Sequence, residues 1–282
     1  KDRYLSMRAL VETVLDYTIQ HGQEIRTLRQ QARAKVRTQQ QAAVHWEADH
    51  SQPSSFMFRG YEAVYSPSVL GTYMRLSYDR QKQWEKAIPY FNRFVPDILV
   101  EQPKAYLIPQ AWRHVIERLQ WNGVQMTRVE ETHEREVQVY RIPSVASRPN
   151  AYEGHMFHDQ VSLTAVTETV RIEAGDYIIS LDQDQARYAI ETLEPSAHDS
   201  FFRWGFFNSV LEKKEAYSDY VFEDSAAEIL RTEPETRAAF EAWKAVNPEI
   251  LDSQESVLDF IFAHCRKYRE PEWRRYPVYR LF

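Results

Sequence analysis

A short segment of the sequence gathers four side chains that could bind a metal ion. Glu153, His155, His158 and Asp159 fall within seven residues. Imidazole and carboxylate groups are normal zinc ligands, so a loop here could bring two or three of them together. In an extended strand, His155 and His158 would instead point to opposite faces. The segment allows a metal site made of Glu153, His155 and His158, or a polar strand entry with surface histidines, and we favour the second interpretation.

A second pattern that could hold zinc, His-x-x-Glu, occurs three times. Residues three apart on a helix share a face, so such a pair could chelate a metal ion. No third ligand follows any of them in a suitable loop, and we assign no metal ligand to them. The three pairs are His21 with Glu24, His114 with Glu117, and His133 with Glu136.

Two further groups contain the residue types of hydrolytic sites. His198, Asp199 and Ser200 are consecutive, so their side chains diverge and cannot form a triad. We expect Asp199 or Ser200 to cap a helix that begins at Phe201. The other group is the pair Glu191 and Glu194, which could act as acid and base. Because it falls on the last turn before Pro195, we expect both carboxylates to be solvated.

The single cysteine, Cys265, has two interpretations. Arg266 and Lys267 could lower the pKa of its thiol and make it reactive. Phe260 and Phe262 precede it on a predicted helix, which favours a buried structural thiol. We favour the buried thiol and predict no catalytic residue in the chain.

The composition excludes several classes of function. Seven glycines in 282 residues supply no dinucleotide-binding turn, P-loop or nucleophile elbow. A net charge of −6 argues against a nucleic-acid partner. One cysteine permits no intramolecular disulfide and no cysteine-rich zinc site. No apolar run approaches the ~20 residues of a membrane helix. We therefore expect no nucleic-acid partner, no membrane span and no cofactor in this chain.

The N-terminal segment has helical periodicity over roughly 30 residues, with apolar side chains at alternating spacings of four and three. This stripe is too apolar to face water, so we expect it to associate with another surface. A second copy of the same helix is one partner, and the segment Phe56–Tyr78 is the alternative. The stripe comprises Met7, Val11, Val14, Thr18, Ile25 and Leu28.

The following residues favour strands. Phe56–Tyr78 is rich in Phe, Tyr, Val and Thr, which predicts two or three strands with turns at Gly60 and Gly71. The prolines that follow should prevent any long regular element. These are Pro89, Pro96 and Pro103.

A strand–helix–strand succession comes next. Ala105–Ile108 is a short apolar strand, and Gln110–Gln120 has helical spacing that Gly123 should end. Val124–Val129 then resumes as a strand. Together they predict a β-α-β-like unit.

A hairpin is predicted after the strand Val161–Val170. Residues 173–176 form its turn, with Gly175 at positive φ, and Tyr177–Ile179 returns. Asp182 or Asp184 should cap the next helix, Gln185–Leu193, and the C-terminal part is helical. The fold class is α+β, with a long N-terminal helix and a mixed β-sheet region.

Several segments together resemble the C-terminal region of large bacterial zinc metallocarboxypeptidases of the carboxypeptidase A type. The most specific is the pair Leu193–Ser196 and His198–Phe207. The others are Ala105–Pro109, Tyr152–His155 and Ala174–Ile179. In that family zinc is held by His-x-x-Glu and a distant His, and a Glu acts as general base. None of the matching segments carries these residues, so the resemblance transfers no catalytic residue.

The resemblance implies a non-catalytic C-terminal part of a peptide-hydrolysing parent protein. Its partner is the catalytic domain of the same protein, which holds the zinc. The opening residues Lys1–Tyr4 contain neither Met nor a signal-peptide pattern, so we expect a piece of a longer protein. The resemblance further implies a periplasmic or secreted location. The alternative is an independent peptide- or glycan-binding module without enzymatic activity.

The sequence and this resemblance together predict three domains. Residues 1–50 form the long helix that closes the catalytic domain, and residues 51–104 form a β-rich segment with a Pro-rich linker. Residues 105–282 form an α+β accessory domain.

Overall fold

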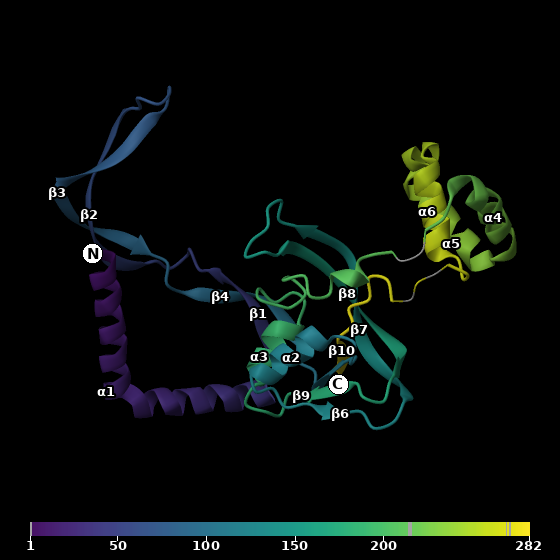
Figure 1. Ribbon diagram of the computed structural model, residues 1–282, viewed down its shortest axis with the longest axis horizontal. Helices are drawn as coiled ribbons and strands as arrows, with labels where there is room; N and C mark the ends of the chain where they lie inside the picture. Colours follow the sequence, from purple (N-terminus) through teal and green to yellow (C-terminus); the bar gives the residue numbers. More distant parts are fainter. Residues whose placement is uncertain (1, 214–215, 269, 271) are drawn as a thin grey trace. The chain divides into compact units, whose positions relative to one another are not determined.

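The computed structural model describes residues 2–213, 216–268, 270 and 272–282, and it confirms the α+β class (Figure 1). The helices are α1 (Asp2–Thr38), α2 (Arg113–Trp121), α3 (Ala186–Leu193), α4 (Asp219–Thr232), α5 (Pro234–Val246) and α6 (Gln254–His264), with short 3-10 turns η1 (Asn208–Val210) and η2 (Pro248–Asp252). The strands are β1 (Gln41–Ala48), β2 (Ser54–Pro67), β3 (Met74–Tyr90), β4 (Phe94–Glu101), β5 (Ala105–Ile108), β6 (Thr127–Arg128), β7 (His133–Ser147), β8 (His158–Ile172), β9 (Tyr177–Ser180) and β10 (Tyr279–Leu281).

The chain divides into two compact units. One combines Lys1–Gln40 with Gln102–Phe282, and the other is Gln41–Glu101. The functional division into 1–50, 51–104 and 105–282 stays a prediction. Within the described residues, no helix is both long and apolar enough to cross a membrane.

The first unit is built on a six-stranded sheet in the order β6-β9-β5-β10-β7-β8. Every pair of neighbours in it is antiparallel. We expected a mixed β-sheet region with a β-α-β-like unit. The two strands of that unit, β5 and β6, do run in the same direction. They are not direct neighbours, because β9 lies between them.

One face of this sheet carries a contiguous apolar core. Alternate residues of a strand share a face, and Leu107, Val139 and Ile172 are completely buried there. Burial of apolar surface contributes about 25 cal/mol per Å², so this cluster stabilises the sheet. It also includes Ala105, Val129, Val137, Val170, Tyr279 and Leu281.

The hairpin predicted at residues 173–176 is wrong in its pairing. Gly175 does have a positive φ of 100°, but β8 pairs with β7, whereas β9 pairs with β5 and β6. The turn therefore connects two strands that are not neighbours. A glycine is favoured because this φ is strained for any residue with a side chain, and a Cβ atom at residue 175 would also displace the amide of Gln110, whose Oε1 would lie 2.9 Å away.

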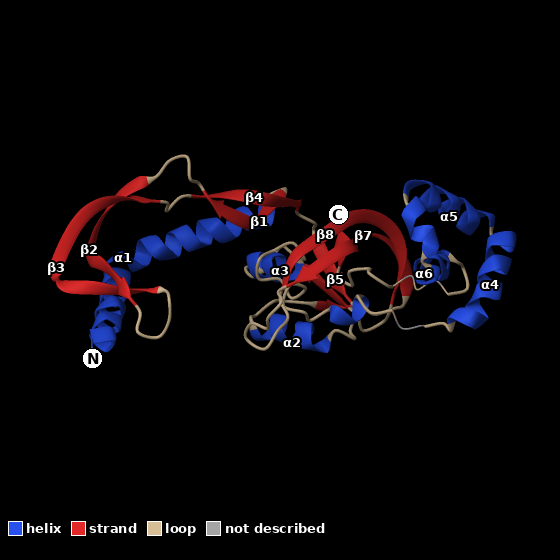
Figure 2. Cartoon of the chain, turned by 90° about the horizontal axis from the view of Figure 1, so that it is seen from above, coloured by secondary structure: helices blue, strands red, loops and turns tan. Residues whose placement is uncertain are grey.

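The second unit contains two separate antiparallel pairs, β1 with β4 and β2 with β3. Figure 2 shows β2 and β3 as a long curved ribbon, and neither strand contains a buried residue. Gly60 lies inside β2, not at the predicted turn, and faces the ring of Trp84. Pro89 and Pro96 also lie within strands, contrary to expectation, because each of these strands has a free edge that needs no proline N–H.

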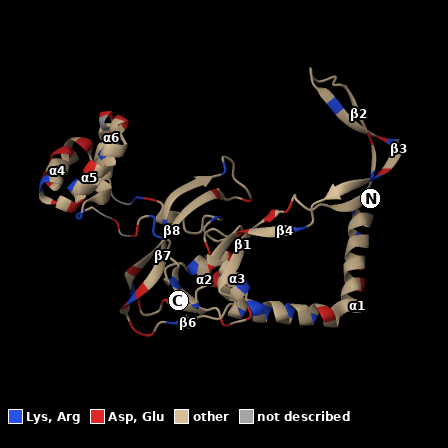
Figure 3. Ribbon diagram, turned by 180° about the vertical axis from the view of Figure 1, so that it is seen from behind, with Lys and Arg blue, Asp and Glu red and all other residues tan. Residues whose placement is uncertain are grey.

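Helix α1 confirms the predicted N-terminal helix, but it ends at Thr38 and not at residue 50, because Gln41–Ala48 form β1. The helix bends sharply along its length (Figure 1). None of its described residues is buried. Basic residues gather toward its C-terminal end (Figure 3). There, Arg33 Nη1 lies 3.0 Å from Asp184 Oδ2. Arg37 also binds this carboxylate. Asp184 thus pairs with α1, and neither it nor Asp182 caps α3, whose N-cap is Gln185 without a side-chain hydrogen bond.

The helices α4, α5 and α6 share a core of their own. Phe222, Leu258, Phe262 and Cys265 are among its buried residues. Residues 201–207 form consecutive turns before η1, not the predicted helix. Ser200 nevertheless accepts a hydrogen bond from the backbone N–H of Arg203 at 3.2 Å, as a capping residue would.

Candidate functional site

The predicted metal candidates lie at the entry to β8. Tyr152 and His155 exchange two backbone hydrogen bonds across a tight turn. Glu153 and Gly154 occupy its centre, both at positive φ. The turn leaves Glu153 and His155 exposed, whereas His158 is buried. Of the three candidates, only His158 is thus inside the protein.

The surroundings of these histidines do not fit zinc. Nδ1 of His158 lies 2.8 Å from Oγ of Ser147, and Nε2 lies 2.8 Å from Oδ1 of Asn208. The ring of His155 stacks on Phe206. In the part of the chain that the structure describes, no group of three or more His, Cys, Asp or Glu could hold a metal ion.

The other sequence candidates are also scattered. Nδ1 of His21 lies 3.2 Å from Glu24 on the surface of α1, and Nδ1 of His114 lies 3.9 Å from Glu117 on α2. The third pair, His133 and Glu136, lies on β7 rather than on a helix. None of the three pairs belongs to a larger ligand group among the described residues.

Cys265 is completely buried, as expected. Desolvation raises the pKa of its thiol. A raised pKa leaves little thiolate at neutral pH, so the reactive interpretation is not supported.

The position of Glu194 contradicts the expectation that the carboxylates of Glu191 and Glu194 are both solvated. This residue is 0% exposed, where we predicted a surface position before Pro195. Tyr106 and Tyr140 donate hydrogen bonds to its two oxygens at 2.7 and 3.1 Å. Nε of Arg280, itself 4% exposed, lies 3.2 Å from Oε1. The carboxylate thus joins the end of α3 to β5, β7 and β10.

Burial raises the pKa of Glu194, while Arg280 and the tyrosine hydrogen bonds oppose the shift. Burial also raises the pKa of Tyr106 far above its ordinary value. A buried charge is tolerated only when it is paired and hydrogen-bonded. We therefore interpret this cluster as a structural ion pair.

A cavity of about 430 Å³ lies beside the sheet and is the strongest candidate for a binding site. This volume is in the usual range for small-ligand pockets. Its walls come from the start of α2, the segment around η1 and the approach to β10. The lining residues are Pro109, Trp112, Ser209, Val210, Glu212, Glu270, Glu272, Trp273, Arg275, Pro277 and Tyr279.

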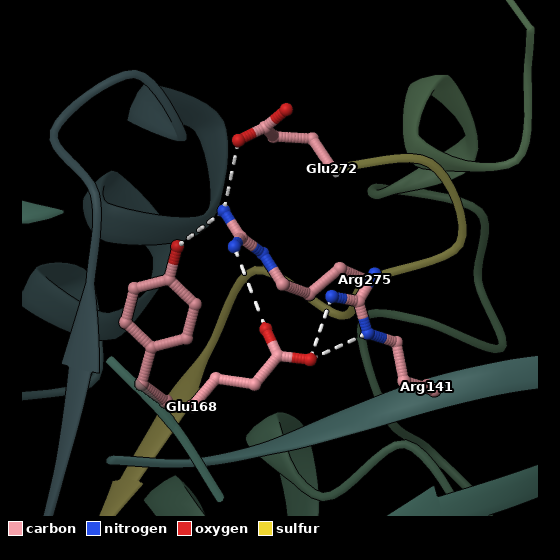
Figure 4. Close-up of polar contacts among 5 residues, drawn as sticks. Arg141, Glu168, Glu272 and Arg275 are labelled. Carbon is pink, nitrogen blue, oxygen red and sulfur yellow. Dashed lines mark hydrogen bonds and ion pairs between the residues drawn. The ribbon is translucent and has the colours of Figure 1, made fainter. Parts of the chain in front are cut away.

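Arg275 is one of the polar residues that line this cavity, and Figure 4 shows the contacts of its guanidinium. Its Nη1 lies 3.7 Å from Glu168 Oε2, and its Nη2 lies 3.2 Å from Glu272 Oε1 and 3.5 Å from the hydroxyl of Tyr279. Nε of Arg141 donates to the other oxygen of Glu168 at 2.8 Å. Two carboxylates thus surround the guanidinium of Arg275 and hold it against the sheet.

The residue before it, Arg274, has a positive φ of 54°. This conformation is uncommon for a residue with a side chain and costs of order 1 kcal/mol. A backbone hydrogen bond from its N–H to Val210 O at 2.7 Å holds it in place. The kink lies between Trp273 and Arg275, both of which line the cavity.

Sequence reasoning missed this pocket. The helical spacing of Gln110–Gln120 does not reveal that Trp112 lines a cavity, and the basic, aromatic residues 273–280 have no periodicity that points to one. The alternation of Trp, Arg and Tyr in that stretch was the available signal, because such side chains are frequent at binding sites.

Part of the chain is similar to fungal proteins named carboxypeptidase 2. A segment of 104 residues is 32% identical to that of Trichophyton tonsurans, covering 37% of this chain and 19% of the relative. A segment of 110 residues is 30% identical to that of Trichophyton rubrum, covering 39% and 20% respectively. The chain thus matches about a fifth of each relative's length. No family model and no solved structure matches it significantly.

The fold defines an α+β protein, and the comparison identifies a carboxypeptidase-related region within it. The relatives are fungal, whereas the resemblance in the sequence was to bacterial enzymes. The coarser relationship, to carboxypeptidases, is the one that the comparison supports.

Proposed function

We propose that this chain is the non-catalytic C-terminal part of a zinc metallocarboxypeptidase. In this proposal it packs on the catalytic domain of the same protein and shapes the access of peptide substrates. The observation that carries the proposal is the partial match, which covers only about a fifth of each carboxypeptidase. The remaining length of such a protein is ample for a zinc-binding catalytic domain, located in the periplasm or outside the cell.

The chemistry of the described residues agrees with this assignment. A catalytic zinc needs about three protein ligands and an open position, and the described part of the chain offers no such group. Helix α1 provides a surface for the catalytic domain, since Met7, Val14 and Leu28 are more than half exposed. Burial of these side chains would stabilise such a contact.

Metal analysis and a peptidase assay test the proposal. The 282-residue chain, purified without a His tag and dialysed against zinc, should hold less than one zinc per chain. It should not hydrolyse hippuryl-phenylalanine or hippuryl-arginine. One zinc per chain, lost in the His155→Ala/Glu153→Gln variant while the fold is kept, would overturn the proposal. This variant leaves the buried His158 unchanged, so a loss of zinc would not result from unfolding of the protein.

An independent peptide- or glycan-binding module is the second candidate, and the aromatic cavity around Trp112 and Trp273 favours it. The gene upstream of Lys1 separates the two functions. A His-x-x-Glu followed by a distant His in that stretch supports the peptidase, and their absence supports the module.

A further inference from the structure

The two most buried arginines of the described residues differ in their partners. Arg280 is 4% exposed and Arg203 is 9% exposed. Nε of Arg280 lies 3.2 Å from Glu194, whereas the guanidinium of Arg203 has no hydrogen bond and no direct ion pair among the residues that the structure describes. Its Nε is closed off from solvent without an acceptor. A buried charge is costly unless it is paired and hydrogen-bonded, so Arg203 lacks the kind of partner that Arg280 has.

The backbone holds Arg203 beside the entry to β8. Its N–H donates a hydrogen bond to Oγ of the completely buried Ser200 at 3.2 Å. Its carbonyl oxygen accepts one from the N–H of His158, the first residue of β8, at 2.9 Å. The side chain therefore starts from a fixed point, and the part of the residue that stays exposed leaves an approach from solvent.

The charges near Arg203 favour an anionic partner. Burial lowers the pKa of Arg203, and the charge of Asp159 opposes this shift. Asp159 is already engaged, because Nε of Arg148 donates to its two oxygens at 2.9 and 3.0 Å. Two guanidinium groups thus share one carboxylate, and a second carboxylate would neutralise these three side chains.

We propose that Arg203 is the anchor of a carboxylate-binding site at the entry to β8. Its planar guanidinium presents N–H groups that match the two oxygens of a ligand carboxylate. The C-terminus of a peptide and an acidic side chain are both sources of this group. The site shares no residue with the cavity beside Arg275, and it goes beyond the accessory role proposed above without resting on it.

A titration of the intact, isotope-labelled chain followed by nuclear magnetic resonance tests the proposal. The probes are N-acetyl-glycine, which has a C-terminal carboxylate, and N-acetyl-aspartic acid α-amide, which has a side-chain carboxylate. N-acetyl-glycine amide is the neutral match of the first probe. We expect at least one carboxylate to shift the Nε–H signal of Arg203 and to bind at least about tenfold more tightly than the neutral amide. Binding of neither carboxylate, as expected if water alone satisfies Arg203, would overturn the proposal.

Two variants of Arg203 locate the ligand. Arg203→Met keeps an apolar stem and removes the charge, so it should abolish carboxylate binding. Arg203→Lys keeps the charge without the planar fork, and it should weaken binding at least about tenfold. Arg231→Met removes an exposed arginine from α4 and is the control, with unchanged binding. Normal binding by Arg203→Met would place the ligand elsewhere, and the proposal would fail.

Inorganic phosphate distinguishes the competing class of anion. A dianion would leave an excess negative charge beside Asp159, so we expect phosphate to bind more weakly than the carboxylates. Tighter binding of phosphate than of either carboxylate would overturn the assignment to a carboxylate.

The melting temperature of the ligand-free protein separates this role from a purely structural one. A buried guanidinium without a partner destabilises the free protein, so Arg203→Met should melt at a temperature at least as high as the unmodified chain. N-acetyl-glycine should raise the melting temperature of the unmodified chain and leave that of Arg203→Met unchanged. A lower melting temperature for ligand-free Arg203→Met would show that Arg203 already has a stabilising partner in the free protein, and this would contradict the proposal.

Discussion

The six-stranded sheet and the β2–β3 ribbon are built from the same kind of residues, yet only one of them has an interior. Leu107 and Val139 in the sheet are completely buried, whereas every residue of β2 and β3 remains at least partly exposed. A two-stranded ribbon is marginally stable in water without a third strand or a covering helix. Long strands and aromatic side chains are therefore not sufficient to form a buried core. The number of neighbouring strands that pair in the sheet determines whether a core forms.

The buried pair of Glu194 and Arg280 gives the largest expected effect. Glu194→Gln leaves a buried guanidinium without its opposite charge, which should lower the free energy of unfolding by about 3–5 kcal/mol. Urea denaturation followed by circular dichroism measures this change. Glu136→Gln, an exposed substitution on β7, is the control and should stay within about 0.5 kcal/mol.

A double variant covers the case in which Glu194→Gln does not fold. Glu194→Leu with Arg280→Met removes both charges together, and apolar replacements of buried pairs are often neutral. We expect it to be more stable than Glu194→Gln. If the single and double variants are equally unstable, the ion pair is not the reason for the loss.

Truncations of apolar side chains compare the two regions directly. Leu107→Ala in the sheet should cost about 2–5 kcal/mol, because it leaves a cavity among completely buried neighbours. Leu76→Ala in β3 removes the same atoms from a side chain that is 44% exposed, and should cost less than about 1 kcal/mol. Equal losses in urea denaturation would show that the ribbon has a buried face in solution.

Two of the four described glycines at positive φ, Gly175 and Gly154, differ in their surroundings. Gly175→Val should lower the unfolding free energy by about 1–2 kcal/mol, because of backbone strain and contact with Gln110. Gly154→Val has the same kind of backbone strain, but no atom lies within 4 Å of its new Cβ. It should cost less, and thermal melts of both variants check the order. An unchanged melting temperature for Gly175→Val would contradict the observed turn.

We expect association through α1 to have the smallest effect on the free energy of unfolding. It should be detected as an increase in the molar mass of the protein in solution. The exposed stripe should pair with a second copy at high concentration in the absence of the catalytic domain. Light scattering at two concentrations should detect dimers, and Val14→Lys/Leu28→Lys should abolish them. Gln23→Lys/Gln30→Lys adds the same charge to the opposite face of the helix and should leave the mass unchanged.

A monomer at high concentration for the unmodified chain would contradict this association. The bend in α1 limits its form, because a straight coiled coil could not follow the whole stripe. An unfolded Val14→Lys/Leu28→Lys variant would instead assign the stripe to the chain's own core.

Local patterns predicted the elements better than their partners. The apolar residues of β5 and the glycine after α2 were sufficient to locate both, since spacing and a C-cap are local signals. The partner of β9 was wrong because the turn at Gly175 is compatible with a hairpin, and only distant strands decide the pairing. Pro89 and Pro96 were expected to prevent long regular elements, because the sequence does not show that their strands keep a free edge.

The candidate site was likewise only partly predictable from local sequence patterns. Nothing beside Glu194 in the sequence indicates that Arg280 and two tyrosines surround its carboxylate, since the contacts join residues that are far apart in the chain. The cavity likewise combines Trp112 with Ser209 and Glu212 and with Trp273 and Tyr279, which lie far from it in the chain. Such sites depend on tertiary structure, and the composition of each contributing segment predicts only part of them.

The place of β10 in the sheet has a consequence for how the protein is made. This strand lies between β5 and β7, and its Arg280 contacts Gln138, a residue 142 positions earlier in the chain. Folding rates fall as contacting residues become more distant in sequence. A nascent chain on the ribosome could not complete this sheet until Tyr279–Leu281 had left the exit tunnel. Until then the edges of β5 and β7 would be open to chaperones or to aggregation.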